Sequence, residues 1–148
     1  MSYDYQGHEY YELMRRENQR LTHVLHAVGD MLRGERGDVE RLVYDLGQLV
    51  ELLDSHFDHE EQSDFVTNVR RRAPHLLQTA QEAIAQHADI SDQAKKILIL
   101  ARNGVVSDAW WRQLSLRFDE FAREFLAHEA HEYELLQSAY GQDIGAAD

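Results

Sequence analysis

Two short motifs of histidine and glutamate have the composition of a metal-binding site. His56 is followed four residues later by Glu60, and His128 is followed four residues later by Glu132, so that both motifs read H-x-x-H-E. Residues four apart lie on the same face of a helix, so each motif would direct one imidazole and one carboxylate to a common point. Two such motifs from distant parts of the chain could hold the same metal site from opposite sides of a helical bundle.

These residues fall on the apolar faces of the expected helices. His56 and Glu60 continue a series of leucines spaced by three and four residues, and His128 and Glu132 continue a similar series of leucine and phenylalanine. His87 lies on the apolar face of a third segment. A carboxylate buried without a partner costs several kcal/mol, so these glutamates need a cation or strong hydrogen bonds. Three imidazoles and two carboxylates suit iron, manganese or zinc, whereas calcium prefers oxygen ligands.

Each of these residues taken singly has an ordinary structural explanation. A lone histidine on an apolar face is most often a hydrogen-bonded core residue, and a lone buried glutamate can pair with an arginine. The repeated spacing of histidine and glutamate in two segments is harder to explain in this way. For the set as a whole, metal binding is the favoured interpretation.

The elements that position these residues are predicted to be four long helices. One proline and eight glycines in 148 residues favour helices over strands. Glycines, Asp38, Pro74 and Asp108 divide the chain into segments of about 10–33, 38 to beyond 61, 74–103 and 108–140, with 65–73 as the least certain boundary. Apolar positions alternate in steps of three and four over Tyr11–Leu32, Val39–Glu60, Leu77–Leu98 and Leu114–Leu135. This periodicity, with short connections, predicts an all-α, up-down-up-down antiparallel four-helix bundle.

Length and composition indicate one globular domain. The 148 residues, 43% of them hydrophobic, are enough for a single domain over 1–148, with a core at about 10–140 and short polar tails. The net charge of −12 argues against nucleic acid or an anionic membrane as a partner. There is no cysteine, the N-terminus lacks the features of a signal peptide, and the longest aliphatic run is far shorter than a membrane span. We therefore expect a soluble, cytoplasmic protein.

The two halves of the chain also resemble an internal repeat. Residues 86–90 around the third-segment histidine parallel residues 17–21, which places Asn18 where a fourth histidine would be expected. His23 and His26 are close in sequence but are predicted to lie on the outward face of the first helix. Asn18 is therefore the first-helix residue that the repeat directs toward the site.

Four further residues within or directly after the two motifs are predicted to lie mainly at the surface. His59 and His131 could donate hydrogen bonds to the metal ligands, but a surface position is the favoured interpretation for both. Glu61 and Glu129 are predicted to be solvated carboxylates.

The motifs resemble those of the hemerythrin family, specifically the bacterial hemerythrin-like (HHE cation-binding) domains, over about residues 10–140. The resemblance implies a non-haem di-iron centre with two bridging glutamates, for which the matching ligands are His56, Glu60, His87, His128 and Glu132. The first-helix histidine of the family falls at Asn18, and a second third-helix histidine has no counterpart at Ala83 or Ser91. An amide oxygen is a weaker donor to iron than imidazole, although water or Glu17 could complete the coordination. We therefore expect an asymmetric centre with one metal ion held more loosely.

Three functions are compatible with such a site. The resemblance favours a protein that binds or senses dioxygen, a related small diatomic molecule, or iron. The same irons could instead serve an oxidase or peroxidase, for which Tyr133 is the nearest aromatic residue. A third hypothesis is an interaction module that an ion stabilises. Iron is the expected metal, with zinc or manganese as alternatives, and a binding protein is favoured over an enzyme.

Overall fold

The computed structural model describes residues 5–34 and 37–140 of the protein. Within these ranges the chain is helical and has no strand; its elements are α1 (Tyr5–Arg33), α2 (Val39–Glu61), α3 (Phe65–Arg72), the 3-10 turn η1 (Pro74–Leu76), α4 (Leu77–Asn103) and α5 (Asp108–Tyr140). The predicted all-α fold is confirmed. Residues 1–4 and 141–148 of the predicted polar tails lie outside the described ranges. None of the described helices combines the length and apolar character needed to cross a membrane.

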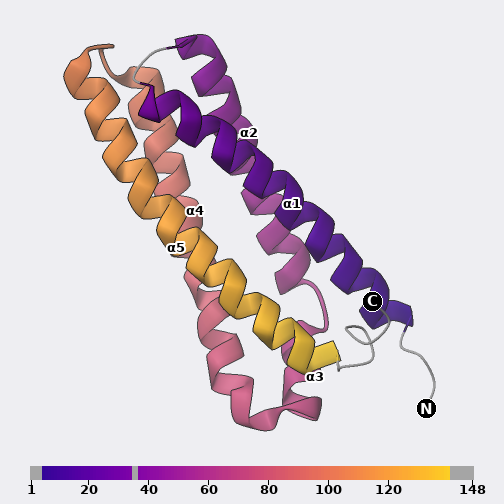
Figure 1. Ribbon diagram of the computed structural model, residues 1–148. Coiled ribbons are helices and arrows are strands. Elements are labelled where there is room, and N and C mark those ends of the chain that lie inside the picture. The colour runs from indigo at the N-terminus through magenta and orange to yellow at the C-terminus, as the bar shows by residue number, and fades with distance from the viewer. Residues whose placement is uncertain (1–4, 35–36, 141–148) are drawn as a thin grey trace.

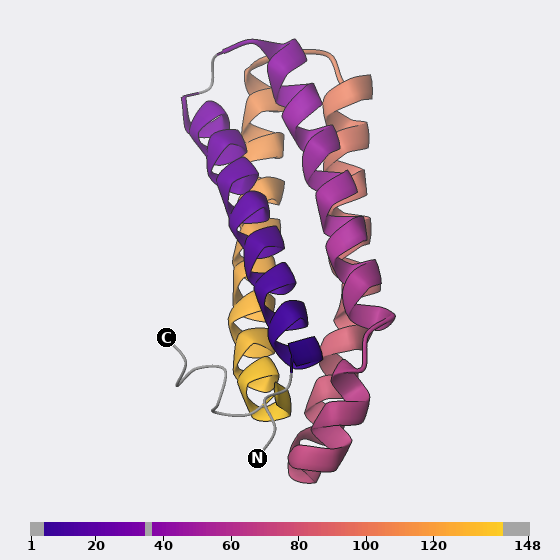
Figure 2. The ribbon, with the colours of Figure 1, turned by 90° about the vertical axis from the view of Figure 1, so that its right-hand side faces the viewer.

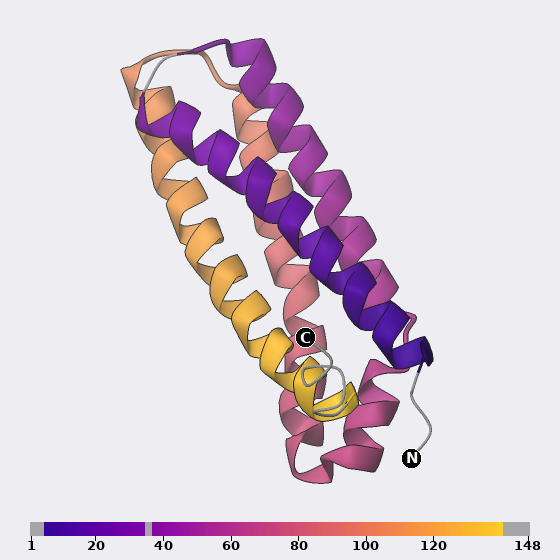
Figure 3. The ribbon, with the colours of Figure 1, turned by 45° about the vertical axis from the view of Figure 1, so that its right-hand side comes forward.

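The four long helices pack side by side along the length of the molecule. α1 contacts α2 and α5, and α4 contacts the same two helices (Figures 1 and 2). The end of α1 and the start of α2 lie at the same end of the molecule as the α4–α5 connection. α3 and η1 lie at the opposite end (Figure 3). Each long helix therefore passes the middle of the molecule, where side chains from all four can meet.

The described chain contains five α-helices because the region 65–73 forms the short helix α3. The Ser63 hydroxyl accepts a hydrogen bond from the Phe65 N–H at 3.2 Å and donates one to the Glu60 carbonyl at 2.6 Å, which starts the helix directly after α2. Phe65 and Val69, four residues apart, are both buried, and α3 packs against α5. Arginines 70–72 occupy the last turn, where positive charge is favourable. A helix of only two turns is too short for its periodicity to be recognised.

The predicted helix boundaries agree closely with the structure. Asp38 caps α2 by accepting a hydrogen bond from the Glu40 N–H at 2.9 Å. The Ser107 hydroxyl accepts the Trp110 N–H at 3.1 Å at the start of α5. Two starts differ from the prediction, because α1 begins at Tyr5 and Pro74 begins η1 rather than α4 itself.

The apolar core is divided into two clusters. The larger lies toward the α4–α5 connection and includes Leu25, Leu46 and Phe121, and the smaller includes Phe65 and Leu135. The predicted apolar seams are buried or half-buried throughout. Between the two clusters lies a layer of polar side chains, one or two from each long helix: Asn18 from α1, His56 and Glu60 from α2, His87 from α4, and His128 and Glu132 from α5. The fold thus places the predicted ligands in one polar layer inside an apolar interior.

Candidate metal centre

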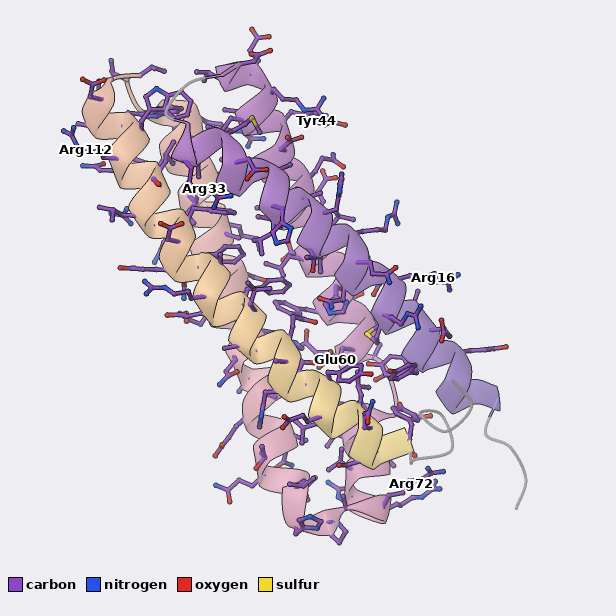
Figure 4. All side chains as sticks on the ribbon, in the orientation of Figure 1. Arg16, Arg33, Tyr44, Glu60, Arg72 and Arg112 are labelled. Atoms are coloured by element: carbon purple, nitrogen blue, oxygen red, sulfur yellow. The ribbon has the colours of Figure 1, made fainter. Side chains whose placement is uncertain are left out.

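All five predicted ligands are buried. The exposed fraction is 2% for His56, Glu60, His87 and Glu132, and 4% for His128. Figure 4 shows Glu60 inside the bundle, whereas Arg16 and Arg112 extend outward from it. The prediction that these side chains lie in the interior is confirmed. His23 and His26 are exposed, also as predicted.

Three of the five residues form a compact group with metal-ligand spacing. One ligand atom each from His87, His128 and Glu132 lies within 4.8 Å of the others, close enough for one ion to reach all three. His87 Nε2 lies 3.0 Å from Glu132 Oε1 and 3.4 Å from Glu60 Oε1, and His128 Nε2 also contacts Glu132 Oε1. We call His87, His128 and Glu132 the inner group; Glu60 adjoins it.

His56 lies outside the inner group and contacts carboxylates at both ring nitrogens. Its Nε2 lies 3.2 Å from Glu129 Oε1, and its Nδ1 lies 3.1 Å from Glu17 Oε1. The Glu129 side chain is only 11% exposed, so the prediction that it is a solvated carboxylate is wrong. Glu17, considered as a possible ligand, instead contacts the Nδ1 side of His56.

The three buried histidines share one orientation. Two of them have a hydrogen-bond acceptor from a neighbouring helix at Nδ1: Glu17 Oε1 at 3.1 Å from His56 and Gln86 Oε1 at 2.8 Å from His128. His87 Nδ1 lies 3.6 Å from Glu61 Oε2 and has no hydrogen-bond partner among the described residues. The Nε2 atoms face the buried carboxylates. An acceptor at Nδ1 favours the tautomer that carries the proton there and leaves Nε2 free to bind a metal ion.

Aromatic packing fixes the His87 ring between its neighbours. The Phe57 ring stacks on His87 at 3.9 Å between centroids, with 3° between the planes. The His128 ring meets His87 edge to face at 5.0 Å. These contacts restrict rotation of the imidazole and hold its Nε2 toward the carboxylates.

His59 connects the site to solvent. Its side chain is 44% exposed, as predicted, but its Nδ1 lies 2.7 Å from Glu17 Oε2. Glu17 therefore bridges an exposed histidine and the buried His56. The predicted surface position of His59 is confirmed, and its contact is with Glu17 and not with one of the five predicted ligands. His131 is exposed.

Several buried polar atoms of the layer have no hydrogen-bond partner. Among the described residues these include Asn18 Oδ1, Glu60 Oε1, Glu132 Oε2 and His128 Nε2. A cavity of about 70 Å³ lies beside them, with walls formed by Tyr11, Met14, Arg15, Asn18, His56, Glu60, Glu129, Glu132, Tyr133 and Leu136. Unpaired buried oxygens are costly, and a metal ion would satisfy them. The donor set therefore fits a transition-metal ion.

The pKa values of two histidines shift in opposite directions. Burial lowers the pKa of His56, but hydrogen bonds to Glu129 and Glu17 outweigh burial and raise it to about 10. Burial, together with the charges of His87, His56 and His131, lowers the pKa of His128 to about 3. Burial also raises the pKa of Glu60. Without a metal ion, a proton on His56 balances the surrounding carboxylates.

The site described by this geometry is a buried histidine–carboxylate centre of an all-helical protein. The chain has no match among models of known protein families, among curated proteins or among solved structures. The resemblance to hemerythrin-like domains therefore depends on the sequence motifs alone.

Proposed function

We propose that the protein is a hemerythrin-like non-haem iron protein, an up-down-up-down four-helix bundle that holds a di-iron centre in its polar layer. The observation that carries this proposal is the common orientation of His56, His87 and His128. His56 and His128 each have a hydrogen-bond acceptor at Nδ1, and the Nε2 atoms of all three histidines lie beside carboxylate oxygens. An arrangement of this kind is typical of metal-binding histidines.

The ligands in this proposal are His56, Glu60, His87, His128 and Glu132, with Glu60 and Glu132 between the metal ions. A mixture of imidazole and carboxylate donors suits iron, with zinc or manganese as alternatives. The neutral state of His128, whose pKa lies at about 3, leaves its Nε2 lone pair available across the physiological range. Metal binding at His56 would displace its proton.

The proposed role is the binding or sensing of dioxygen, a related small diatomic molecule, or iron. Iron, when bound, would supply an open coordination position for such a ligand. The cavity has a volume of about 70 Å³, whereas one water molecule needs roughly 10–15 Å³. The cavity therefore has space for a small molecule. Its walls combine the apolar Met14 and Leu136 with charged side chains, among them Arg15 and Glu129.

Anaerobic reconstitution with ferrous iron, followed by exposure to air, tests this proposal. We expect about two iron ions per chain and a visible absorption that disappears on deoxygenation. His128→Ala should lose most of the iron, while His26→Ala, which changes an exposed histidine on α1, should keep it. Equal iron content in the two variants would refute the proposal.

One observation favours an oxidase or peroxidase as the second candidate. The Tyr11 hydroxyl donates a hydrogen bond to the Tyr133 hydroxyl at 2.6 Å, and both tyrosines line the cavity. Phenols beside an iron centre could take part in redox chemistry. Sustained consumption of hydrogen peroxide by the iron-loaded protein, reduced in Tyr133→Phe, would support this function over reversible binding.

A further inference from the structure

Two tyrosines from the first and last helices meet beside the polar layer. Tyr11 of α1 is buried, with an exposed fraction of 4%, whereas Tyr133 of α5 is 47% exposed. The Tyr11 hydroxyl donates a hydrogen bond to the Tyr133 hydroxyl at 2.6 Å, and the ring centroids lie 5.9 Å apart, a distance typical of packed aromatic pairs. Both tyrosines line the cavity, together with His56 and Glu60. Both phenols are therefore accessible to an oxidant that enters the cavity.

The hydrogen bond gives the buried phenol a route for its proton. Oxidation of a phenol by one electron also releases one proton. The Tyr11 proton can pass to the Tyr133 oxygen, and the Tyr133 proton can leave to solvent because that side chain is half exposed. Oxidation of this pair therefore leaves no uncompensated charge in the apolar interior.

A second tyrosine pair in the same molecule provides a comparison. Tyr10 and Tyr140 also join α1 to α5, and their ring centroids lie 5.4 Å apart. Within the described part of the chain, neither belongs to the cavity wall, and the buried Tyr10 hydroxyl has no hydrogen-bond partner. The two pairs are thus similar in ring distance but differ in access to the cavity and in the route for a proton.

We propose that Tyr11 and Tyr133 form an oxidative modification site, at which peroxide couples the two rings to o,o′-dityrosine and joins α1 covalently to α5. Each phenol loses one electron and one proton, a carbon–carbon bond forms between one ortho carbon of each ring, and the ortho hydrogens then move to the phenol oxygens. The two electrons and two protons reduce one molecule of hydrogen peroxide to two molecules of water. Iron, when bound, would supply the one-electron chemistry. The inference rests on the proposed function, since it requires iron in the polar layer.

The cross-link would also change the stability of the protein. It would join residues that lie 122 positions apart in the sequence. Closing so long a loop reduces the entropy of the unfolded chain. The coupled protein should therefore melt at a higher temperature than the uncoupled protein.

Addition of one equivalent of hydrogen peroxide to the iron-loaded full-length protein tests the inference. We expect dityrosine fluorescence, and peptide mapping should identify a cross-link between Tyr11 and Tyr133 with a mass lower by two hydrogen atoms. Tyr133→Phe should lose this cross-link, whereas Tyr140→Phe, the matched change in the second pair, should keep it. Circular dichroism verifies that both variants remain helical. Coupling of Tyr10 to Tyr140 in equal yield, or oxidation of Met14 without coupling of the tyrosines, would overturn the inference.

Iron content measured on the same samples separates this inference from the proposed function. A protein that binds iron and forms no cross-link would overturn the inference and leave the proposed function intact. A protein that binds no iron would overturn the proposed function and, with it, the iron-dependent reaction. Illumination of the metal-free protein with persulfate and a ruthenium sensitiser tests the arrangement of the two rings without iron. We expect the same cross-link, and coupling only between separate molecules would contradict the proposed pairing.

Discussion

The Nε2 atom of His56 on α2 lies 3.2 Å from Oε1 of Glu129 on α5. This contact joins α2 and α5, which lie diagonally across the bundle. It adds the mostly buried carboxylate of Glu129 to those of Glu60 and Glu132 in the polar layer. At the other ring nitrogen, Glu17 from α1 holds His56 at 3.1 Å. The orientation of this imidazole is therefore set by three helices together.

Gln86 should control metal affinity although it is not expected to touch the ion. Its side-chain oxygen lies 2.8 Å from His128 Nδ1 and holds that ring with Nε2 toward Glu132. Loss of such a support typically weakens metal binding about 10–100-fold. We expect Gln86→Ala to show this loss in competition titrations with a chromophoric chelator. Gln81→Ala, an exposed change on the same helix, is the control, and equal affinities of the two variants would contradict the assigned role.

The stability of the metal-free protein should decrease as the pH rises from about 6.5 to about 10. Folding raises the pKa of His56 from 6.5 to about 10, since its hydrogen bonds to Glu129 and Glu17 outweigh the effect of burial. A raised pKa stabilises the folded state fully below 6.5, and this contribution is lost as the pH approaches 10. Denaturant unfolding of the metal-free protein and of His56→Gln measures the effect. The difference between their unfolding free energies should shrink over this pH range. A constant difference would contradict the raised pKa of His56.

Metal removal should lower the melting temperature. A ligand that binds only the folded state stabilises it by about 2.7 kcal/mol at a concentration one hundred times its dissociation constant. Calorimetry of the metal-loaded protein before and after treatment with a chelator measures this change. We expect a clear decrease, and a much smaller one in His87→Ala, which lacks a residue of the inner group. The same melting temperature with and without metal would indicate that the ion does not bind the folded polar layer.

Two glycines should respond oppositely to replacement by alanine. Gly47 lies within α2, and an added Cβ would meet only Arg102 Nη2, at 3.8 Å, so Gly47→Ala should stabilise the protein by about 0.5–1 kcal/mol. At Gly104 the Cβ would lie 2.6 Å from Trp110 Cδ1 and 2.8 Å from the Leu100 carbonyl oxygen. Gly104→Ala should therefore destabilise it by about 1–3 kcal/mol. Urea unfolding measures the unfolding free energies of both variants. Similar changes in the two would contradict the close packing of Gly104 against Trp110 at the start of α5.

The sequence was sufficient to predict the long helices and the buried positions of the five candidate ligands. Periodicity determines which face of a helix is buried, and the H-x-x-x-E spacing places both side chains of each pair on that face. His56 and Glu60, for example, are both 2% exposed. α3 could not be predicted in the same way, because Phe65 and Val69 alone are too few to define a period.

Glu129 illustrates why part of the site could not be predicted. It adjoins His128 in sequence but lies off the apolar seam, where a glutamate is usually solvated. Only the assembly of the helices around the polar layer brings it from α5 across the bundle to His56 on α2. Gln86, which adjoins the seam residue His87 in sequence, depends on the packing of α4 against α5. Such contacts across helices depend on the rotation of each helix and leave no regular spacing in the chain.

The most direct test of the metal centre is a crystal structure of the metal-loaded protein with anomalous scattering data. We predict anomalous peaks in the polar layer between the two apolar clusters, with the Nε2 atoms of His56, His87 and His128 directed at them. A layer without such a peak, in which these side chains contact only water and one another, would contradict the account.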